Sequence, residues 1–196
     1  MCFRTIYGAT TIQAAFGELL AGLRPPTSND EQRAVLEKLD GVSWDRHAGT
    51  VPATWRFRRQ SALARFPLRA KFIDLRHAGT ISHLRSTFVP FMNAYFPDVI
   101  ASDDFDLSDA MSRNRRLTQH LARYLHDLPI SEMEELGAEE LITGIRYPSR
   151  HSADWDCWAV FADRIGDGLV VDLPKDIDVD HPDLQAVAAA FNLTVE

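Results

Sequence analysis

The stretch Gly144–Arg150, taken with the apolar run Cys157–Phe161, constrains the fold more than any other part of the chain. The first stretch reads as a β-strand that ends at Pro148, because proline cannot donate a hydrogen bond to a strand ladder. A loop with Ser149 and Arg150 follows, and the chain then resumes as a buried strand. Polar side chains at the end of a rigid strand are a common basis for a binding site. The sequence therefore predicts two strands with a candidate site between them.

Composition places the chain among ordinary globular proteins. It has 196 residues, 45% of them hydrophobic and 25% charged, which is enough for one substantial core or for a core with an appendage. We predict a single domain. The formal net charge of -7 argues against a general polyanion binder. No apolar run approaches the roughly 18 residues of a membrane span, and the start of the chain lacks the apolar core of a signal peptide. We therefore expect a cytoplasmic protein with no membrane contact.

The patterns typical of metal sites and disulfide frameworks do not occur in this sequence. Cys2 and Cys157 are far apart and belong to no Cys-x-x-Cys or Cys/His pattern of the zinc type. The alternating aspartates between Asp172 and Asp180 lack the glycine and the terminal glutamate of a calcium loop. We therefore expect no metal and no bound cofactor.

Local patterns predict a strand followed by helices in the first part of the chain. Arg4–Ala9 has the composition of a strand, and Thr10 or Thr11 can cap a helix whose apolar residues recur at helical spacing up to Leu23. A second helix is predicted from Ser28 or Asn29 to Gly41, where the glycine ends it.

The remaining elements mix strands and helices without a regular βαβ rhythm, which indicates the α+β class. Residues Pro52–Asp74 are predicted to form a β-hairpin with strands Ser61–Ala64 and Lys71–Leu75. The other predicted elements are helices over Leu107–Leu128, Ser131–Leu136 and Pro182–Phe191, and strands over Leu141–Arg146, Cys157–Phe161 and Leu169–Leu173.

Several of these stretches, in this order, resemble the RES domain family, which is named after an arginine, a glutamate and a serine. The resemblance covers residues 4–161, and residues 163–196 are then a C-terminal extension. The stretches that carry it are Ile6–Ala9, Ala14–Leu20, Phe72–Leu75, Gly144–Ser149 and Cys157–Phe161. The resemblance implies an α+β fold akin to ADP-ribosyltransferase toxins, with mixed or antiparallel sheets and flanking helices.

The same resemblance implies a reaction and partners. Members of the family degrade NAD by phosphorolysis or hydrolysis of the nicotinamide–ribose bond, with inorganic phosphate as the co-substrate in the first case. Many are bacterial toxins that an Xre-type, DNA-binding antitoxin neutralises, and members are often dimeric. NAD, an antitoxin and a second copy of the chain are thus the partners that the resemblance implies.

The resemblance also assigns site residues. Glu18 matches the family's glutamate, Ser149 its serine and Tyr7 its aromatic residue. The family's arginine lies a few tens of residues before that tyrosine, so we expect the strand that carries it to be missing from this sequence. Arg146 and Arg150 are the nearest local substitutes, and we expect slow turnover or none.

Each assigned residue type suits the chemistry. Cleavage of the nicotinamide–ribose bond develops positive charge on the ribose, which the carboxylate of Glu18 would stabilise. Ser149, with no partner base in the pattern, would position the ribose or a phosphate oxygen. The ring of Tyr7 would stack on nicotinamide, and an arginine would hold the pyrophosphate. Tyr147 is the further residue that we expect to contact NAD.

Structural interpretations stand beside these assignments. Glu18 also fits a solvent-facing helix position, and Ser149 an ordinary turn. Tyr7 and Tyr147 also fit core positions with the hydroxyl at the surface, and Trp155 and Trp158 fit packing. The alternative function is therefore a RES-like protein without activity that binds a nucleotide or a partner.

A basic segment completes the sequence features. Between Arg56 and Phe72 there are six basic residues and no acidic residue. Such a segment is typical of a solvated strand face or of an antitoxin interface, and we do not expect it to bind nucleic acid directly. Its basic residues are Arg56, Arg58, Arg59, Arg65, Arg69 and Lys71.

Overall fold

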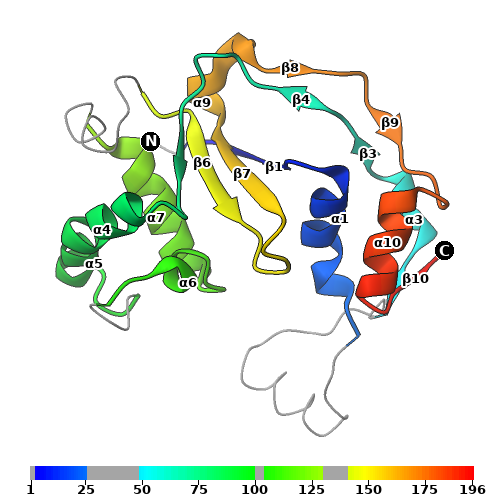
Figure 1. The fold of residues 1–196 in the computed structure, drawn as a ribbon, viewed down its shortest axis with the longest axis horizontal. Helices are drawn as coiled ribbons and strands as arrows, with labels where there is room; N and C mark the ends of the chain where they lie inside the picture. Colours follow the sequence, from blue (N-terminus) through cyan, green and yellow to red (C-terminus); the bar gives the residue numbers. More distant parts are fainter. Residues whose placement is uncertain (1–2, 26–48, 100–103, 130–140) are drawn as a thin grey trace, which may run out of the picture. The chain divides into compact units, whose positions relative to one another are not determined.

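The computed structural model describes residues 3–25, 49–99, 104–129 and 141–196, which form an α+β structure (Figure 1). The chain divides into two compact units. The first comprises residues 1–10 and 64–170, and the second comprises residues 11–63 and 171–196. Most of the predicted C-terminal extension thus belongs to the second unit, and a single domain for the whole chain stays a prediction.

A mixed four-stranded sheet is the centre of the first unit, in the order β1-β7-β6-β5. Neighbouring strands pair antiparallel except β5 and β6, which are parallel. The predicted strands at Arg4–Ala9 and Cys157–Phe161 are confirmed, whereas the strand predicted over Leu141–Arg146 begins at Gly144 and continues to Pro148. The strands are β1 (Thr5–Ala9), β5 (Phe72–Asp74), β6 (Gly144–Pro148) and β7 (Asp156–Phe161).

The helices of the first unit form its core with one face of this sheet. Buried side chains from the sheet, such as Ile145 and Phe161, belong to one cluster with Phe88, Met92 and Leu121 from the helices. The helices that contribute are α4 (Ala78–Ser86), α5 (Phe88–Tyr95), α6 (Leu107–Ala110) and α7 (Arg115–Asp127). We call the sheet face that enters this cluster the core face.

The single helix predicted over Leu107–Leu128 consists of two helices, α6 and α7. Asp106 caps α6 in a capping box, and Asn114 caps α7 by accepting a hydrogen bond from the amide of Leu117. Side chains that compete for backbone hydrogen bonds thus restart the helix at Asn114.

The predicted hairpin over Pro52–Asp74 is wrong. The segment begins with helix α3 (Ala53–Phe57), and its strands pair with distant parts of the chain. Strand β3 (Gln60–Ser61) pairs with β9 (Lys175–Asp176), and β4 (Ala64–Arg65) pairs with β8 (Val170–Val171). An alternating pattern identifies a strand but does not identify its partner.

The second unit packs two helices against each other, α1 (Ile12–Leu20) and α10 (Pro182–Ala190). Thr11 caps α1, as predicted, and a short helix η1 (Ala21–Leu23) extends it. The predicted terminal helix is confirmed as α10, with Pro182 in its first turn. Strands β2 (Thr50–Val51) and β10 (Thr194–Val195) pair in parallel.

The remaining predictions concern two short helices and the residues between β7 and β8. The helices predicted over residues 28–41 and 131–136 lie outside the described residues. Between β7 and β8 the chain forms helix α9 (Ala162–Ile165) and a short helix η2 (Gly166–Gly168). In the part of the chain that the structure describes, no helix combines the length and the apolar character that crossing a membrane requires.

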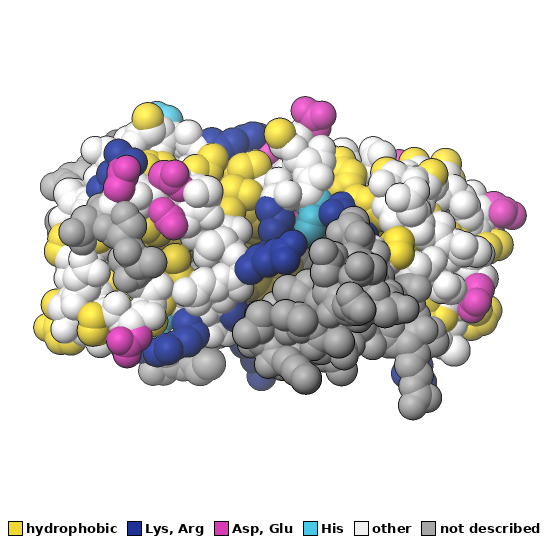
Figure 2. All heavy atoms as spheres, turned by 90° about the horizontal axis from the view of Figure 1, so that it is seen from below, with side chains coloured by type: hydrophobic (Ala, Val, Ile, Leu, Met, Phe, Trp, Pro, Cys, Tyr) yellow, Lys and Arg dark blue, Asp and Glu magenta, His cyan; other side chains and the backbone are white. Residues whose placement is uncertain are grey.

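Part of the basic segment is used by the fold of the second unit. The guanidinium of Arg56 is buried and donates hydrogen bonds to the carbonyls of Glu196 and Ile177. That of Arg59 lies 4.6 Å from the Trp55 ring centroid and donates to the Trp55 carbonyl. On the face drawn in Figure 2, basic, acidic and hydrophobic side chains all occur, so that face is not uniformly basic. A partner interface at this segment stays a prediction.

Candidate functional site

The turn that carries Ser149 lies where the ends of three strands meet. Pro148 pairs with Asp156 at the end of the β6–β7 ladder, and the amide of Thr10, just after β1, donates to the carbonyl of Asp156 at 2.9 Å. Ser149 then closes the turn, because its amide donates to the carbonyl of Trp155 at 2.6 Å. One end of the sheet is therefore formed by three strand ends, which are the carboxyl ends of β1 and β6 and the start of β7.

Ser149 itself is almost completely buried, with 4% of its surface exposed. Its hydroxyl oxygen accepts a hydrogen bond from the amide of His151 at 2.9 Å. A serine hydroxyl that accepts from the amide two residues later is typical of a turn residue. The interpretation of Ser149 as a turn residue thus describes its local contacts, and its role toward a substrate stays a prediction.

The strand register separates the predicted site residues onto two faces of the sheet. Tyr7 pairs with Ala159, and Ala159 pairs with Ile145 of the core. Because paired residues share a face and successive residues alternate, Tyr7 and Tyr147 belong to the core face and Arg146 to the opposite one. Tyr147 packs against the core, whereas Tyr7, on the edge strand, is 72% exposed.

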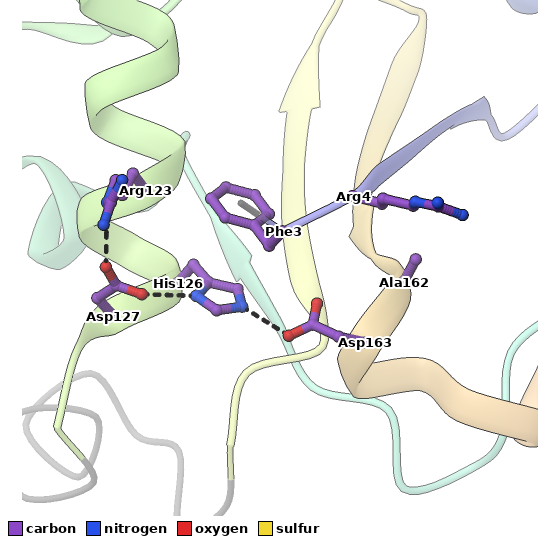
Figure 3. Close-up of a pocket in the computed structure, with 7 residues that line it drawn as sticks. All are labelled: Phe3, Arg4, Arg123, His126, Asp127, Ala162 and Asp163. Atoms are coloured by element: carbon purple, nitrogen blue, oxygen red, sulfur yellow. Dashed lines mark hydrogen bonds and ion pairs between the residues drawn. The ribbon is translucent and has the colours of Figure 1, made fainter. Parts of the chain in front are cut away.

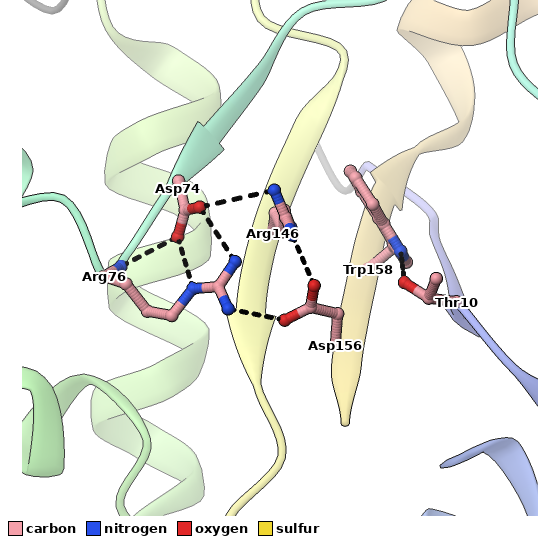
Figure 4. Close-up of polar contacts among 6 residues, drawn as sticks. All are labelled: Thr10, Asp74, Arg76, Arg146, Asp156 and Trp158. Atoms are coloured by element: carbon pink, nitrogen blue, oxygen red, sulfur yellow. Dashed lines mark hydrogen bonds and ion pairs between the residues drawn. The ribbon is translucent and has the colours of Figure 1, made fainter. Parts of the chain in front are cut away.

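We call the opposite face the charged face, because four ionised side chains form a closed network on it (Figure 4). Arg76 pairs with Asp74 at 3.1 Å and with Asp156 at 2.8 Å. Arg146 pairs with Asp156 and, at 3.6 Å, with Asp74. We name these four residues the arginine network, in which two guanidinium groups balance two carboxylates.

The arginine network lowers the pKa of one of its carboxyl groups. Burial alone would raise the pKa of Asp74, but the hydrogen bonds from Arg76 and the charges of Arg76 and Arg146 outweigh it. The pKa of Asp74 therefore lies below its ordinary value, and the carboxylate stays ionised. Both guanidinium groups of the arginine network are thus already engaged by carboxylates.

Arg150 differs from Arg146 in this respect. It lies in the exposed turn after β6, with its Nε atom 3.4 Å from Nε2 of His151. Of the two arginines that the sequence predicted to substitute for the family's arginine, Arg150 is thus the more accessible to a ligand. Both assignments stay predictions.

Trp158 is the residue of the charged face that sequence reasoning assigned to packing alone. Its indole N–H donates to the hydroxyl of Thr10 at 3.1 Å, and the guanidinium carbon of Arg146 lies 5.4 Å from its ring centroid (Figure 4). The sequence did contain a signal. Asp156 and Trp158 are two residues apart on a strand and therefore share a face, as do Gly144 and Arg146.

Gly144, the first residue of the motif, is explained by close packing on this face. A Cβ atom placed there would lie 3.0 Å from Cε1 of Phe72 and from the Cα of Val160. It would also collide with the carbonyl oxygen of Ala159. Only glycine therefore lets the Phe72 ring lie across β6 in this position.

Glu18, the predicted catalytic carboxylate, lies on α1 of the second unit. It is half-buried, and it follows the buried residues Phe16 and Gly17. The five other predicted site residues all belong to the first unit. The structure thus brings Tyr7, Arg146, Tyr147, Ser149 and Arg150 onto one sheet and the turn that follows it, and the contribution of Glu18 to their site stays a prediction.

A second polar cluster lies at the other end of the same sheet, next to a cavity of about 510 Å³ (Figure 3). The Nδ1 atom of His126 lies 2.7 Å from a carboxylate oxygen of Asp127, and its Nε2 atom lies 2.9 Å from one of Asp163. The ring of Phe3 stacks on the imidazole, with 4.3 Å between centroids. We name His126, Asp127 and Asp163 the histidine cluster. The cavity is lined by Phe3, Arg4, Arg123, His126, Asp127, Ala162 and Asp163.

The histidine cluster lowers the pKa of both of its carboxyl groups. For Asp127 the hydrogen bond from His126 outweighs burial, and for Asp163 burial alone would raise the pKa but the same histidine outweighs it. Among the described residues, no group of histidine, cysteine and acidic side chains is arranged to hold a metal ion. The sequence did not predict this cluster, because its members and Phe3 come from distant segments.

No family model, no curated protein and no solved structure matches this chain. The resemblance to the RES family therefore depends on the quoted residues and their order alone.

Proposed function

We propose that this protein binds NAD and cleaves its nicotinamide–ribose bond. The observation that carries the proposal is that Tyr7, Arg146, Tyr147, Ser149 and Arg150 belong to one sheet, on strands β1 and β6, or to the turn after β6. Tyr7 is far from the other four residues in the sequence. The resemblance to the RES family assigned all five to one site. Their membership of one sheet and its adjoining turn supports a common site.

In the proposed reaction, the C–N bond breaks with its electron pair leaving on nicotinamide. An oxygen of phosphate or of water then bonds to the ribose carbon, and water releases a proton. Glu18 would stabilise the positive charge that develops on the ribose, and Ser149 would position the ribose. Arg150, as the exposed guanidinium, would contact the pyrophosphate. The products are nicotinamide with ADP-ribose, or nicotinamide with phosphorylated ADP-ribose.

The test is an assay of the full chain with NAD, with and without phosphate, in which chromatography measures nicotinamide and mass spectrometry identifies the second product. We expect slow release of nicotinamide and a drop of about 100-fold in Glu18→Gln, because a carboxylate that stabilises a charged transition state contributes several kcal/mol. Asp167→Asn, an exposed carboxylate of the first unit, is the matched control and should leave the rate unchanged. Equal rates in Glu18→Gln and the unchanged chain would contradict the proposal.

One observation favours the alternative function, a nucleotide-binding protein without activity. Arg146 is neutralised by Asp74 and Asp156, so it cannot act as a free anion clamp. This alternative predicts that calorimetry detects binding of NAD while no nicotinamide is released. The same pair of measurements therefore separates the two functions.

We also propose the biological setting that the resemblance implies. The protein would act in the cytoplasm, as a homodimer or bound to an Xre-type antitoxin, without direct contact with nucleic acid. Light scattering of the purified chain at several concentrations measures the oligomeric state, and a constant monomer mass would contradict the homodimer.

A further inference from the structure

Three aromatic rings on the charged face have no part in the core of the first unit. Phe72 meets Trp158 edge to face with 4.8 Å between centroids, and Phe66 lies 4.9 Å from Phe72 and 5.6 Å from Trp158. Each of the three residues is half-buried. None belongs to the core cluster or to the partly buried side chains that pack against it. Packing of the core therefore does not account for these rings.

The ring of Trp158 is fixed in its orientation by polar contacts. Thr10 accepts its indole N–H at 3.1 Å, and the guanidinium carbon of Arg146 lies 5.4 Å from its centroid. Arg146 is itself held by the two carboxylates of the arginine network. An aromatic ring that is already ordered loses little entropy when a ligand stacks on it, which favours binding.

We infer that Trp158, with Arg146 beside it, is the platform on which a flat heteroaromatic ring of a nucleotide stacks. This inference rests on the proposed function, in which the ring is the nicotinamide or the adenine of NAD. Tyr7, which the sequence suggested for stacking, belongs to the other face of the sheet by register, whereas Trp158 shares its face with Arg146. Every base offers a π-face to an aromatic side chain, and a neighbouring guanidinium adds to such stacking.

The charge balance of the arginine network makes this inference specific. Its two guanidinium groups are matched by two carboxylates, so the platform presents no net positive charge to a phosphate. Trp158 therefore recognises the ring of the ligand. Compounds that share a ring should depend on Trp158 whether or not they carry a phosphate, and a sugar phosphate without a ring should not.

The test is calorimetric titration of the full chain with NAD, nicotinamide mononucleotide, AMP, adenosine and ribose 5-phosphate. Trp158→Ala should weaken the binding of NAD and of at least one ring compound by about 10-fold, the size of a typical stacking contribution. Trp158→Phe should retain most of the affinity, because the aromatic face remains. Tyr95→Ala removes an exposed aromatic ring of α5 in the same unit and is the matched control, with no change expected.

A second variant keeps the inference testable if Trp158→Ala fails to fold. Thr10→Val removes only the acceptor of the indole N–H, at an exposed position, and should weaken ring binding a few-fold with an unchanged circular dichroism spectrum. If Trp158→Ala weakens the binding of nicotinamide mononucleotide, the nicotinamide ring stacks on Trp158. If it weakens the binding of AMP, the adenine ring stacks there.

The outcomes separate this inference from the proposed function. If ring compounds bind through Trp158 but no nicotinamide is released, the reaction is wrong and the platform stands. If nicotinamide is released and Trp158→Ala binds NAD with unchanged affinity, the platform is overturned and the reaction stands. The absence of binding by every ring compound overturns the platform.

Discussion

The arginine network and the histidine cluster lie at opposite ends of one sheet and hold their carboxylates in different ways. The arginine network pairs Asp74 and Asp156 with guanidinium groups, which stay charged at every ordinary pH, beside an ordered tryptophan. The histidine cluster places two carboxylates on one imidazole, which stacks on Phe3. The first orders a surface that can receive a ligand, and the second ties α7 and α9 to the start of the chain. From this difference we infer that the arginine network serves binding and the histidine cluster serves stability.

Gly144→Ala should have the largest effect on stability, because the new Cβ collides with the backbone of β7 and with the Phe72 ring. We expect the free energy of unfolding to fall by about 2–3 kcal/mol, measured by urea denaturation. Gly8→Ala is the matched control, since Gly8 lies on the same sheet and nothing lies within 4 Å of a Cβ placed there. Equal losses in the two variants would mean that close packing on the charged face is not the reason for Gly144.

Asp156→Asn should have the next largest effect. It removes the charge that pairs with both Arg76 and Arg146, so we expect a loss of about 1–2 kcal/mol and weaker binding of ring compounds. Asp104→Asn is the control, because that carboxylate is 85% exposed in its ion pair with Arg85 and should contribute less than about 0.5 kcal/mol. If Asp156→Asn changed neither stability nor binding, the arginine network would not order the platform.

His126→Ala should separate stability from binding. The imidazole is 15% exposed and contacts Phe3 and two carboxylates, so its loss should lower the free energy of unfolding by about 1 kcal/mol. Calorimetric affinities for NAD and AMP should stay unchanged. Weakened nucleotide binding in this variant would place the ligand at the histidine cluster and reverse the comparison.

Acid should expose a smaller effect that both clusters share. The pKa of Asp74 lies below its ordinary value of 3.8, so the unfolded chain takes up this proton first as the pH falls. The stability that Asp74 contributes is therefore complete above about pH 4 and is lost as the pH falls through its folded-state pKa. Asp74→Asn should make the loss of stability with falling pH shallower, as measured by urea denaturation at several pH values. If the dependence of stability on pH were unchanged in Asp74→Asn, Arg76 would not stabilise the ionised form of Asp74.

Elements with local signals were predicted from the sequence. Thr11 caps α1, Pro182 begins α10, and the apolar run before Phe161 forms β7, each as its own residues indicate. The helix predicted over Leu107–Leu128 is two helices, because Asp106 and Asn114 each cap a helix of their own. The apolar spacing continues across Asn114, so the sequence pattern did not reveal the second cap.

The sequence did not predict which strands pair with each other. It also did not predict which side chains form the charged face. The arginine network forms only because β5 lies parallel to β6 in a register that places Asp74 opposite Arg146. The histidine cluster depends on His126 meeting Asp163, 37 positions away. Such contacts follow from tertiary packing. The sequence therefore suggested Arg146 and Ser149 as site residues, which stay predictions, but it suggested neither Asp156 nor the role that we infer for Trp158.

Amide hydrogen exchange of the full chain, with and without NAD, tests the central claim most directly, because it locates the ligand without any substitution. The account predicts slower exchange in the presence of NAD in the turn 149–155 that adjoins the charged face. It predicts unchanged exchange at residues 123–127, which include His126 and Asp127 of the histidine cluster. Slower exchange at residues 123–127 alone, or no change anywhere in the chain, would contradict a nucleotide site on the charged face.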